Sequence, residues 1–335
     1  MSTIPAYPTH RDIPIQAEGT WPATVHRFDE RGAAALRAAE ACGRPLLIRG
    51  APGVGKSQTA RAAAAFAKRP FLSAVIDGRT EPNDLKWRFD AVGRLADAQV
   101  NTSGTLPGEA SYLEPQSLWW AYDWNGASKQ RQNTRRAELL AKTHQGQARL
   151  PATQPKGWQP AEGRAVLLID EIDKADPDLP NALLEVLANK GFQVPYTGEF
   201  VACSDATRPI VVITTNEERE LPNAFLRRCL VLTLELPNSQ VELSKYLVAM
   251  GERHEKFRQK AGLPGRCLAM QAVADRLWVR REQARKDGLY QPGTSEFLDL
   301  VAVLAQLYPD DEATQQAQLD RLDEFAFKKS ATTTA

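Results

Sequence analysis

The feature that most constrains this chain is a glycine-rich stretch at residues 50–57. Its sequence, GAPGVGKS, fits the pattern G-x-x-x-x-G-K-[ST] without a mismatch. An apolar run at 45–48 precedes it and an alanine-rich segment at 58–68 follows it, as expected for a buried strand and a helix. The backbone N–H groups of such a loop surround an anion at a helix N-terminus, so the stretch predicts a nucleoside triphosphate site.

The residues of this phosphate-binding loop have distinct expected roles. Lys56 is expected to reach the β- and γ-phosphates, and the Ser57 hydroxyl is expected to ligate magnesium. The other residues expected to contact the nucleotide are Gly50, Pro52, Gly53, Val54, Gly55 and Gln58. The alternative is a glycine-rich turn that matches by accident, which the flanking strand and helix disfavour.

Composition and charge argue against several classes of protein. The 335 residues include 42 Lys and Arg against 41 Asp and Glu, so there is no global electrostatic case for binding nucleic acid or an acidic membrane. The 4 cysteines and 4 histidines are dispersed, which predicts reduced thiols and no zinc site. No apolar run approaches the ~20 residues of a membrane span, and the N-terminus lacks the apolar region of a signal peptide. We therefore expect a soluble, cytoplasmic protein.

Strands and helices alternate through the first two thirds of the chain. This alternation predicts an α/β fold with a parallel sheet flanked by helices. The predicted strands lie at 45–48, 71–76, 165–169, 209–213 and 230–234, and a hairpin is expected at 191–203. Helices are predicted from Asp29 to a stop at Gly43, from Asp178 to a stop at Gly191, and at 223–228.

The remaining segments predict how the chain divides. We expect an irregular lead-in at 1–20, an α/β core at 21–236, a helical domain at 237–327 and a disordered tail at 328–335. The helices of the second domain are predicted at 239–250, 268–285, 295–307 and 311–327.

An insertion is expected at about 79–163. Its second part, 125–163, is polar and basic, which predicts a surface segment without a core and one amphipathic helix at 134–142. Two interpretations remain open: a mobile loop without a role, or a docking element. The docking residues would be Arg131, Arg135, Arg136 and Trp158.

Polar residues that suit ATP hydrolysis follow two of the predicted strands. Asp170 can hold magnesium through water opposite Ser57, and Glu171 can orient or deprotonate the attacking water. Asn216 can bridge the γ-phosphate and that water. The alternatives are a strand that ends in two solvated acids and an ordinary turn asparagine.

Arg227 and Arg228 close a short predicted helix with no acidic residue next to them. A guanidinium offered to a γ-phosphate stabilises charge in the transition state. The alternative is an ordinary surface pair.

Together these motifs resemble the AAA+ ATPases, and among them the MoxR-like branch. The matching segments are GAPGVGKS (50–57), LLIDEIDKA (167–175), NALLEVLANKGFQV (181–194), TTN (214–216) and LPNAFLRRC (221–229). The resemblance implies a P-loop NTPase core with an all-helical lid, ATP and Mg²⁺ as cofactors, and Asn216 as the first sensor. It implies Arg228 as the arginine finger, although Arg227 stands where the family often has Asp and could take the role.

One departure concerns the second sensor arginine of the family. The pattern that carries it aligns with residues 293–297, where Phe297 stands at the arginine position. Arg280 and Arg281 are candidate substitutes, and we assign no second sensor.

The resemblance implies a ring of identical subunits, a hexamer, that remodels or chaperones a protein partner, commonly one with a von Willebrand factor A-type domain. Neither nucleic acid nor a membrane is expected as a partner. Two other functions would suit the same ATPase core: a nucleic-acid motor or restriction-system subunit, and a nucleotide-gated switch in signalling or defence. A basic stripe on the pore loops would indicate the motor, and slow unstimulated turnover would indicate the switch.

Overall fold

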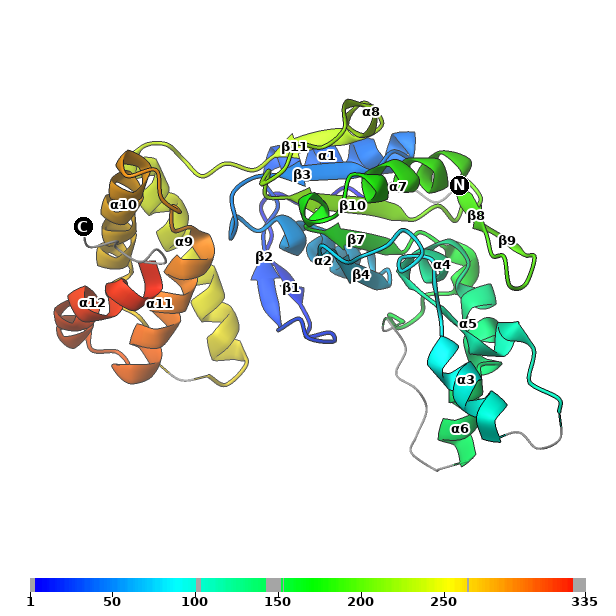
Figure 1. The fold of residues 1–335 in the computed structure, drawn as a ribbon. Helices are drawn as coiled ribbons and strands as arrows, with labels where there is room; N and C mark the ends of the chain where they lie inside the picture. The colour runs from blue at the N-terminus through cyan, green and yellow to red at the C-terminus, as the bar shows by residue number, and fades with distance from the viewer. Residues whose placement is uncertain (1–3, 101–103, 143–151, 153, 264, 328–335) are drawn as a thin grey trace.

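The computed structural model describes the chain except for residues 1–3, 101–103, 143–151, 153, 264 and 328–335. The tail expected to be disordered therefore lies outside the described residues. Figure 1 shows an α/β core with the C-terminal helical domain on one side of it and the insertion on the other.

The centre of the molecule is a parallel sheet of 5 strands, which confirms the predicted α/β fold. Every residue of the two strands that run through 166–170 and 210–215 is buried from solvent, as both faces of the sheet are covered there, whereas the edge strands include the exposed Val75 and Val231. In spatial order the strands are β11 (Leu230–Thr233), β3 (Leu46–Arg49), β10 (Ile210–Thr215), β7 (Val166–Asp170) and β4 (Phe71–Val75).

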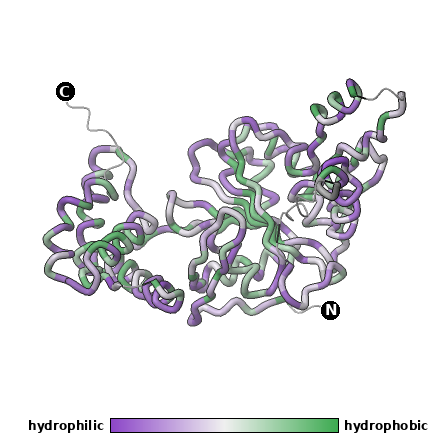
Figure 2. The backbone as a smooth tube through the Cα atoms, turned by 90° about the horizontal axis from the view of Figure 1, so that it is seen from below, coloured by the Kyte–Doolittle hydropathy of each residue, from purple (hydrophilic) through white to green (hydrophobic). Residues whose placement is uncertain are grey.

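Side chains alternate between the two faces of this sheet. Leu46 and Ile48 belong to one core, with α1 (Glu30–Cys42) and α2 (Lys56–Ala67), whereas Leu47 belongs to the other. That second core is covered by α4 (Ser117–Tyr122), α5 (Trp124–Gln132) and α7 (Asp178–Asn189). Figure 2 shows the hydrophobic strands running through the middle of the core.

Helix ends follow the expected capping residues, with one exception. The Asp29 carboxylate accepts a hydrogen bond from Gly32 N–H, and Gly43 ends α1 in the left-handed conformation, as predicted. Helix α7 ends instead at Lys190, whose φ is 53°, so Gly191 is not its stop. Gly191 begins β8, and the predicted hairpin forms between β8 (Gly191–Gln193) and β9 (Phe200–Ala202).

The lead-in expected to be irregular contains a strand, which corrects that prediction. β1 (Ile13–Ile15) pairs antiparallel with β2 (Thr24–His26). Ile13 and Ile15 are buried against the core that includes α2. The strands are too short to show a period in the sequence, and their pairing becomes stable only on this preformed surface.

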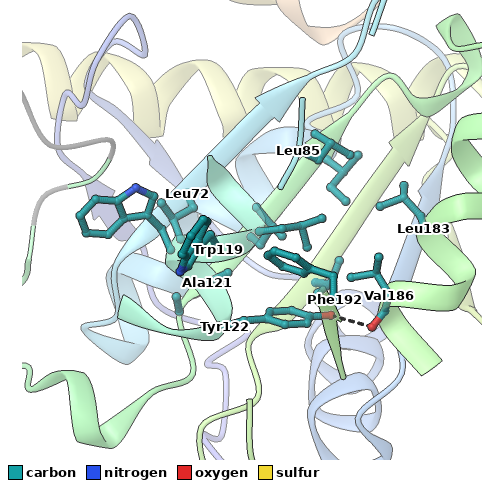
Figure 3. Close-up of a cluster of buried hydrophobic side chains, with 14 of the residues drawn as sticks. Leu72, Leu85, Trp119, Ala121, Tyr122, Leu183, Val186 and Phe192 are labelled. Carbon is teal, nitrogen blue, oxygen red and sulfur yellow. Dashed lines mark hydrogen bonds between the residues drawn. The ribbon is translucent and has the colours of Figure 1, made fainter. Parts of the chain in front are cut away.

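The insertion at 79–163 contains strands and helices, and its second part, 125–163, contributes Ala127, Ala152 and Trp158 to a core, which corrects the prediction of a segment without one. Its elements are β5 (Trp87–Phe89), α3 (Ala91–Val100), β6 (Leu113–Pro115), α4, α5 and α6 (Arg135–Lys142), the last being the expected amphipathic helix. Short 3₁₀ turns lie at Glu109–Tyr112 and Pro160–Glu162. Figure 3 shows Trp119 and Tyr122 packed beside Phe192, with Tyr122 OH donating to the Val186 carbonyl.

The side chains that we expected to dock a partner are engaged within the insertion. Trp158 is 7% exposed, its ring centroid lies 5.1 Å from that of Trp124, and its indole N–H donates to the Gly163 carbonyl. Arg135 pairs with Asp97 and Glu138, and Arg136 pairs with Glu114. Arg131 is half-buried. Trp158 therefore helps to hold the insertion together, whereas the exposed pair of Arg136 contributes little to its stability.

Truncating Trp158 tests this packing. We expect Trp158→Ala to lower the free energy of unfolding by about 3–5 kcal/mol, the usual cost of deleting a buried aromatic ring. Arg136→Ala is the matched control on an exposed side chain, with an expected change within about 0.5 kcal/mol. Urea titrations of the two variants measure both values. A Trp158→Ala protein as stable as the wild type would restore the docking interpretation.

The C-terminal helical domain has its own core. Its helices are α9 (Gln240–Lys260), α10 (Met270–Lys286), α11 (Thr294–Leu307) and α12 (Glu312–Phe327), and α9 extends well beyond the predicted end at residue 250. Phe297, Leu243 and Leu247 are completely buried in its centre. We call this domain the lid. Within the described residues, no helix combines the length and the hydropathy needed to span a membrane.

Candidate functional site

The phosphate-binding loop connects β3 to α2 at the carboxyl edge of the sheet, where ligands bind in open α/β folds. Its glycines are required by the backbone. Gly50 has a φ of 146°, and a Cβ there would lie 2.3 Å from the Leu234 carbonyl oxygen. Gly53 has a φ of 79°. Side chains at either position would strain the loop or push it away from its neighbours.

Lys56 is held by acceptors of its own chain. Its ammonium donates to the carbonyls of Gly50 and Ala51 at 2.7 and 3.0 Å, and to Asn216 Oδ1 at 2.7 Å. Burial lowers the pKa of Lys56, while Asp170 and other nearby carboxylates act in the opposite direction. The ammonium thus lies in a partly desolvated place at the end of the loop, where a phosphate oxygen can replace one of these acceptors.

Ser57 and Asp170 are in direct contact. The Ser57 hydroxyl lies 2.9 Å from Asp170 Oδ1 and 3.0 Å from Oδ2. The Thr214 hydroxyl donates to the same carboxylate and accepts from Glu171 N–H at 2.9 Å. Thr214 therefore fixes both acidic residues to β10, a contact that the sequence analysis did not assign.

Asn216 connects the loop lysine to the second acid. Its Oδ1 accepts from Lys56, and its Nδ2 donates to Glu171 Oε1 at 3.3 Å. Glu171 has a φ of 59°, which is uncommon for a residue with a side chain and places it just beyond the end of β7. The structure thus brings together the five polar side chains singled out in the sequence: Lys56, Ser57, Asp170, Glu171 and Asn216.

Asp173 is a further buried acid that stabilises the turn carrying Asn216. It is 1% exposed, and its Oδ2 accepts from the backbone N–H groups of Asn216 and Glu218 at 3.2 and 3.0 Å. The carboxylate therefore fixes the turn in which Asn216 lies. Asp173 follows Glu171 in the acidic motif, so its position in the sequence was a usable signal.

A cavity of about 410 Å³ extends from the phosphate-binding loop to the lid. Pro52, Gly53, Val54, Gly55, Lys56, Ser57 and Gln58 line it as expected, together with Asp170, Glu171 and Asn216. Gly50 does not line the cavity, since its carbonyl faces Lys56. The Gln58 amide oxygen accepts from Arg61 at 3.0 Å.

The far wall of the cavity was missed in the sequence. It consists of residues from β2 and the segment after it, and of residues from α9 at helical spacing: Val25, His26, Phe28, Tyr246, Met250, Arg253 and His254. Burial lowers the pKa of both His26 and His254 to about 4, with Arg253 acting in the same direction. Both imidazoles are therefore neutral at pH 7, so this wall combines aromatic and apolar side chains with the cation of Arg253.

Arg227 and Arg228 lie outside this cavity. Both are exposed at the end of α8 (Asn223–Leu226), and neither belongs to the cavity lining. The Arg44 guanidinium donates to the backbone carbonyls of both residues. The Arg228 guanidinium itself donates to the Ala224 carbonyl at 3.4 Å. Two exposed cations are therefore held in place away from the subunit's own nucleotide site.

The candidate substitutes for a second sensor are engaged elsewhere. Arg280 forms a bidentate pair with the buried carboxylate of Asp323, and Arg281 donates to the Pro292 carbonyl at 2.6 Å. Neither lines the cavity. Phe297, at the position expected for the arginine, is part of the lid core.

Comparisons with known proteins identify the family of this chain. The model of the AAA domain (dynein-related subfamily) matches residues 45–229, more than half of the chain. No curated protein gives a significant match.

Similar solved structures include NtrX from Brucella abortus, at 14% identity and a TM-score of 0.46, covering 85% of this chain and 53% of that one. Another is a "putative ATPase" from Cytophaga hutchinsonii, at 14% identity and a TM-score of 0.35, covering 86% of this chain and 78% of that one. The chain thus spans about half the length of the NtrX chain. The matched segment contains the loop, both acids, Asn216 and the arginine pair, and the chain belongs to the dynein-related subfamily of AAA ATPase domains.

Proposed function

We propose that this chain is a MoxR-like AAA+ ATPase that binds and hydrolyses Mg²⁺–ATP as a ring of identical subunits and uses turnover to remodel a protein partner. The observation that carries the proposal is the hydrogen-bonded set that joins Lys56, Asn216 and Glu171 at one cavity. In this proposal Lys56 would bind the γ-phosphate, Asn216 would bridge that phosphate and the attacking water, and Glu171 would act as the general base.

The residues present suit magnesium. The Ser57 hydroxyl and the Asp170 carboxylate are hard oxygen donors 2.9 Å apart, and Mg²⁺ commonly binds through one or two such groups, phosphates and water. Within the described residues, no cluster of three or more His, Cys, Asp or Glu forms a metal site of its own. When bound there, magnesium would neutralise charge on the phosphates. Asp170 and Ser57 would orient it, and Thr214 would hold Asp170 in position.

Glu171 is the proposed base, and Asn216 is its proposed partner. A triphosphate in the loop offers Lys56 a stronger acceptor than Asn216 Oδ1, because a charged phosphate oxygen binds an ammonium better than a neutral amide does. We infer that Asn216 then becomes available to the γ-phosphate and to the attacking water, while Glu171 accepts a proton from that water.

The exposed arginines support assembly into a ring. Arg44 holds the backbone of Arg227 and Arg228 outside their own cavity, so either guanidinium can act only on a site of another molecule. A closed ring of identical subunits gives every site one such neighbour. We take a hexamer as the working stoichiometry, and a protein with a von Willebrand factor A-type domain as the working partner.

A trapped complex tests the proposed partner class. We expect Glu171→Gln, loaded with ATP, to retain a protein partner that wild-type protein releases during turnover, and the purified partner to stimulate wild-type ATPase. The double variant Lys56→Ala, Glu171→Gln is the matched control that cannot load ATP. Affinity capture followed by mass spectrometry measures retention. Capture of nucleic acid, or partner binding that is equally strong with and without bound ATP, would contradict the remodelling function.

A further inference from the structure

The Thr294 hydroxyl is a buried polar group of the lid to which the described residues offer no hydrogen bond of normal geometry. Thr294 is 4% exposed, is the first residue of α11, and lines the nucleotide cavity. Among the described residues, no hydrogen-bond partner of normal geometry reaches its Oγ1, although the Tyr246 phenol lies beside it. Buried polar groups in folded proteins are nearly always satisfied, so a hydroxyl like this one indicates a ligand.

The first turn of α11 lies directly against the phosphate-binding loop. The Ser295 Oγ is 3.0 Å from the position that a Cβ on Gly53 would occupy, and the Pro52 carbonyl oxygen is 3.2 Å from the corresponding position on Gly293. The helix has 14 residues, so its N-terminus carries free N–H groups and partial positive charge toward the loop.

One carboxylate belongs to this turn, and it caps the helix start, so it offsets part of the partial positive charge there. The Glu296 carboxylate accepts from Gly293 N–H at 2.8 Å and from the Tyr290 hydroxyl at 2.9 Å, and Glu296 does not line the cavity. Arg253 lines the cavity from α9, but its guanidinium lies 3.9 Å from Asp12, on the side of the cavity near His26. The first turn of α11 therefore faces the loop with neutral donors.

We propose that the Thr294 hydroxyl, with the Ser295 hydroxyl and the N-terminus of α11, binds the terminal phosphate of the nucleotide. The lid then detects a triphosphate through neutral donors at the helix start and not through an arginine. This inference rests on the proposed function, because it requires a triphosphate in the phosphate-binding loop.

Calorimetric titration with a non-hydrolysable ATP analogue and with ADP tests the contact. Thr294→Val keeps the shape and removes the hydroxyl, and we expect it to weaken analogue binding about 10-fold, as for a lost hydrogen bond to a charged group, while ADP binding stays near the wild-type value. Thr294→Ser should restore analogue binding. Ser295→Ala, on an exposed residue, should weaken it by a smaller factor. Thr314→Val, in the first turn of α12, is the matched control.

The possible outcomes are distinct. Wild-type affinity for the analogue in both Thr294→Val and Ser295→Ala would overturn the lid contact. If Thr294→Val does not fold, wild-type affinity for the analogue in Ser295→Ala alone would overturn the lid contact. A large loss in Arg253→Gln with none in Thr294→Val would assign the detection to an arginine. If the wild type binds the analogue no better than Lys56→Ala does, the result would instead contradict the proposed nucleotide site itself.

Discussion

Replacing Arg228 with alanine is expected to lower the maximal ATPase rate by about 10³- to 10⁵-fold, the usual contribution of an arginine finger. The physical reason is that its guanidinium neutralises charge that develops on the γ-phosphate of a neighbouring subunit. ATP affinity should change little, because Arg228 lies outside the cavity of its own chain. Steady-state phosphate release at saturating ATP measures the loss, and Arg227→Ala is the matched control one residue away.

Mixing variants shows whether the arginine acts between subunits. Arg228→Ala subunits keep an intact loop, and Lys56→Ala subunits keep an intact finger, so mixed rings contain some complete sites although neither parent has any. We expect activity to reappear on mixing. Mixtures as inactive as their parents would contradict catalysis between subunits, and an equal loss in Arg227→Ala would leave the identity of the finger open.

Glu171→Gln is expected to lower ATP turnover by about 10²- to 10⁴-fold while ATP still binds. Glutamine keeps the shape and can still pair with the Asn216 amide, but it cannot accept a proton from water. Lys56→Ala should lose affinity for ATP, the step before hydrolysis, because it removes the cation that contacts the triphosphate. Equilibrium binding of ATP and steady-state hydrolysis, measured on both variants, separate the two steps. Full activity in Glu171→Gln would remove this residue from the mechanism.

The polar centre of the site was predictable because each of its parts is local. Lys56 and Ser57 are the first two residues of α2, directly after the phosphate-binding turn, and Glu171 and Asn216 follow buried apolar strands directly. The carboxyl ends of parallel strands meet at one edge of a sheet, so predicting a parallel α/β fold was enough to predict that these side chains lie close together. The same argument could have predicted Thr214 as a site residue, because it lies near the carboxyl end of β10, two positions before Asn216.

The far wall of the cavity could not be predicted in this way. It depends on β2, a strand of 3 residues, meeting one face of α9, which is more than two hundred positions away in the chain. Such pairing depends on tertiary contacts that leave no periodic pattern. The helical spacing of Tyr246, Met250 and Arg253 is visible in the sequence, but it does not show that this face is directed at a cavity.

The prediction that residues 125–163 lack a core was wrong because the overall composition of a segment hides the effect of a few buried aromatic residues. The polar majority of residues 125–163 predicted a surface segment, yet Trp158 in that segment packs on Trp124, which packs on Trp120, with ring centroids 5.1 and 5.0 Å apart. Each such ring buries roughly 150–250 Å², so a few of them can support a core in an otherwise polar stretch. Their irregular spacing gave no helical or strand period to detect.

The central claim is that ATP is hydrolysed at a site completed by a neighbouring subunit. The most direct measurement is Mg²⁺-dependent phosphate release per subunit by the wild type across a dilution series, with mass measured in parallel by light scattering. We predict that the rate per subunit rises steeply as rings form and stays at the Lys56→Ala background in dilute monomer. A rate per subunit that remains constant down to monomer, or that never exceeds this background, would contradict the claim.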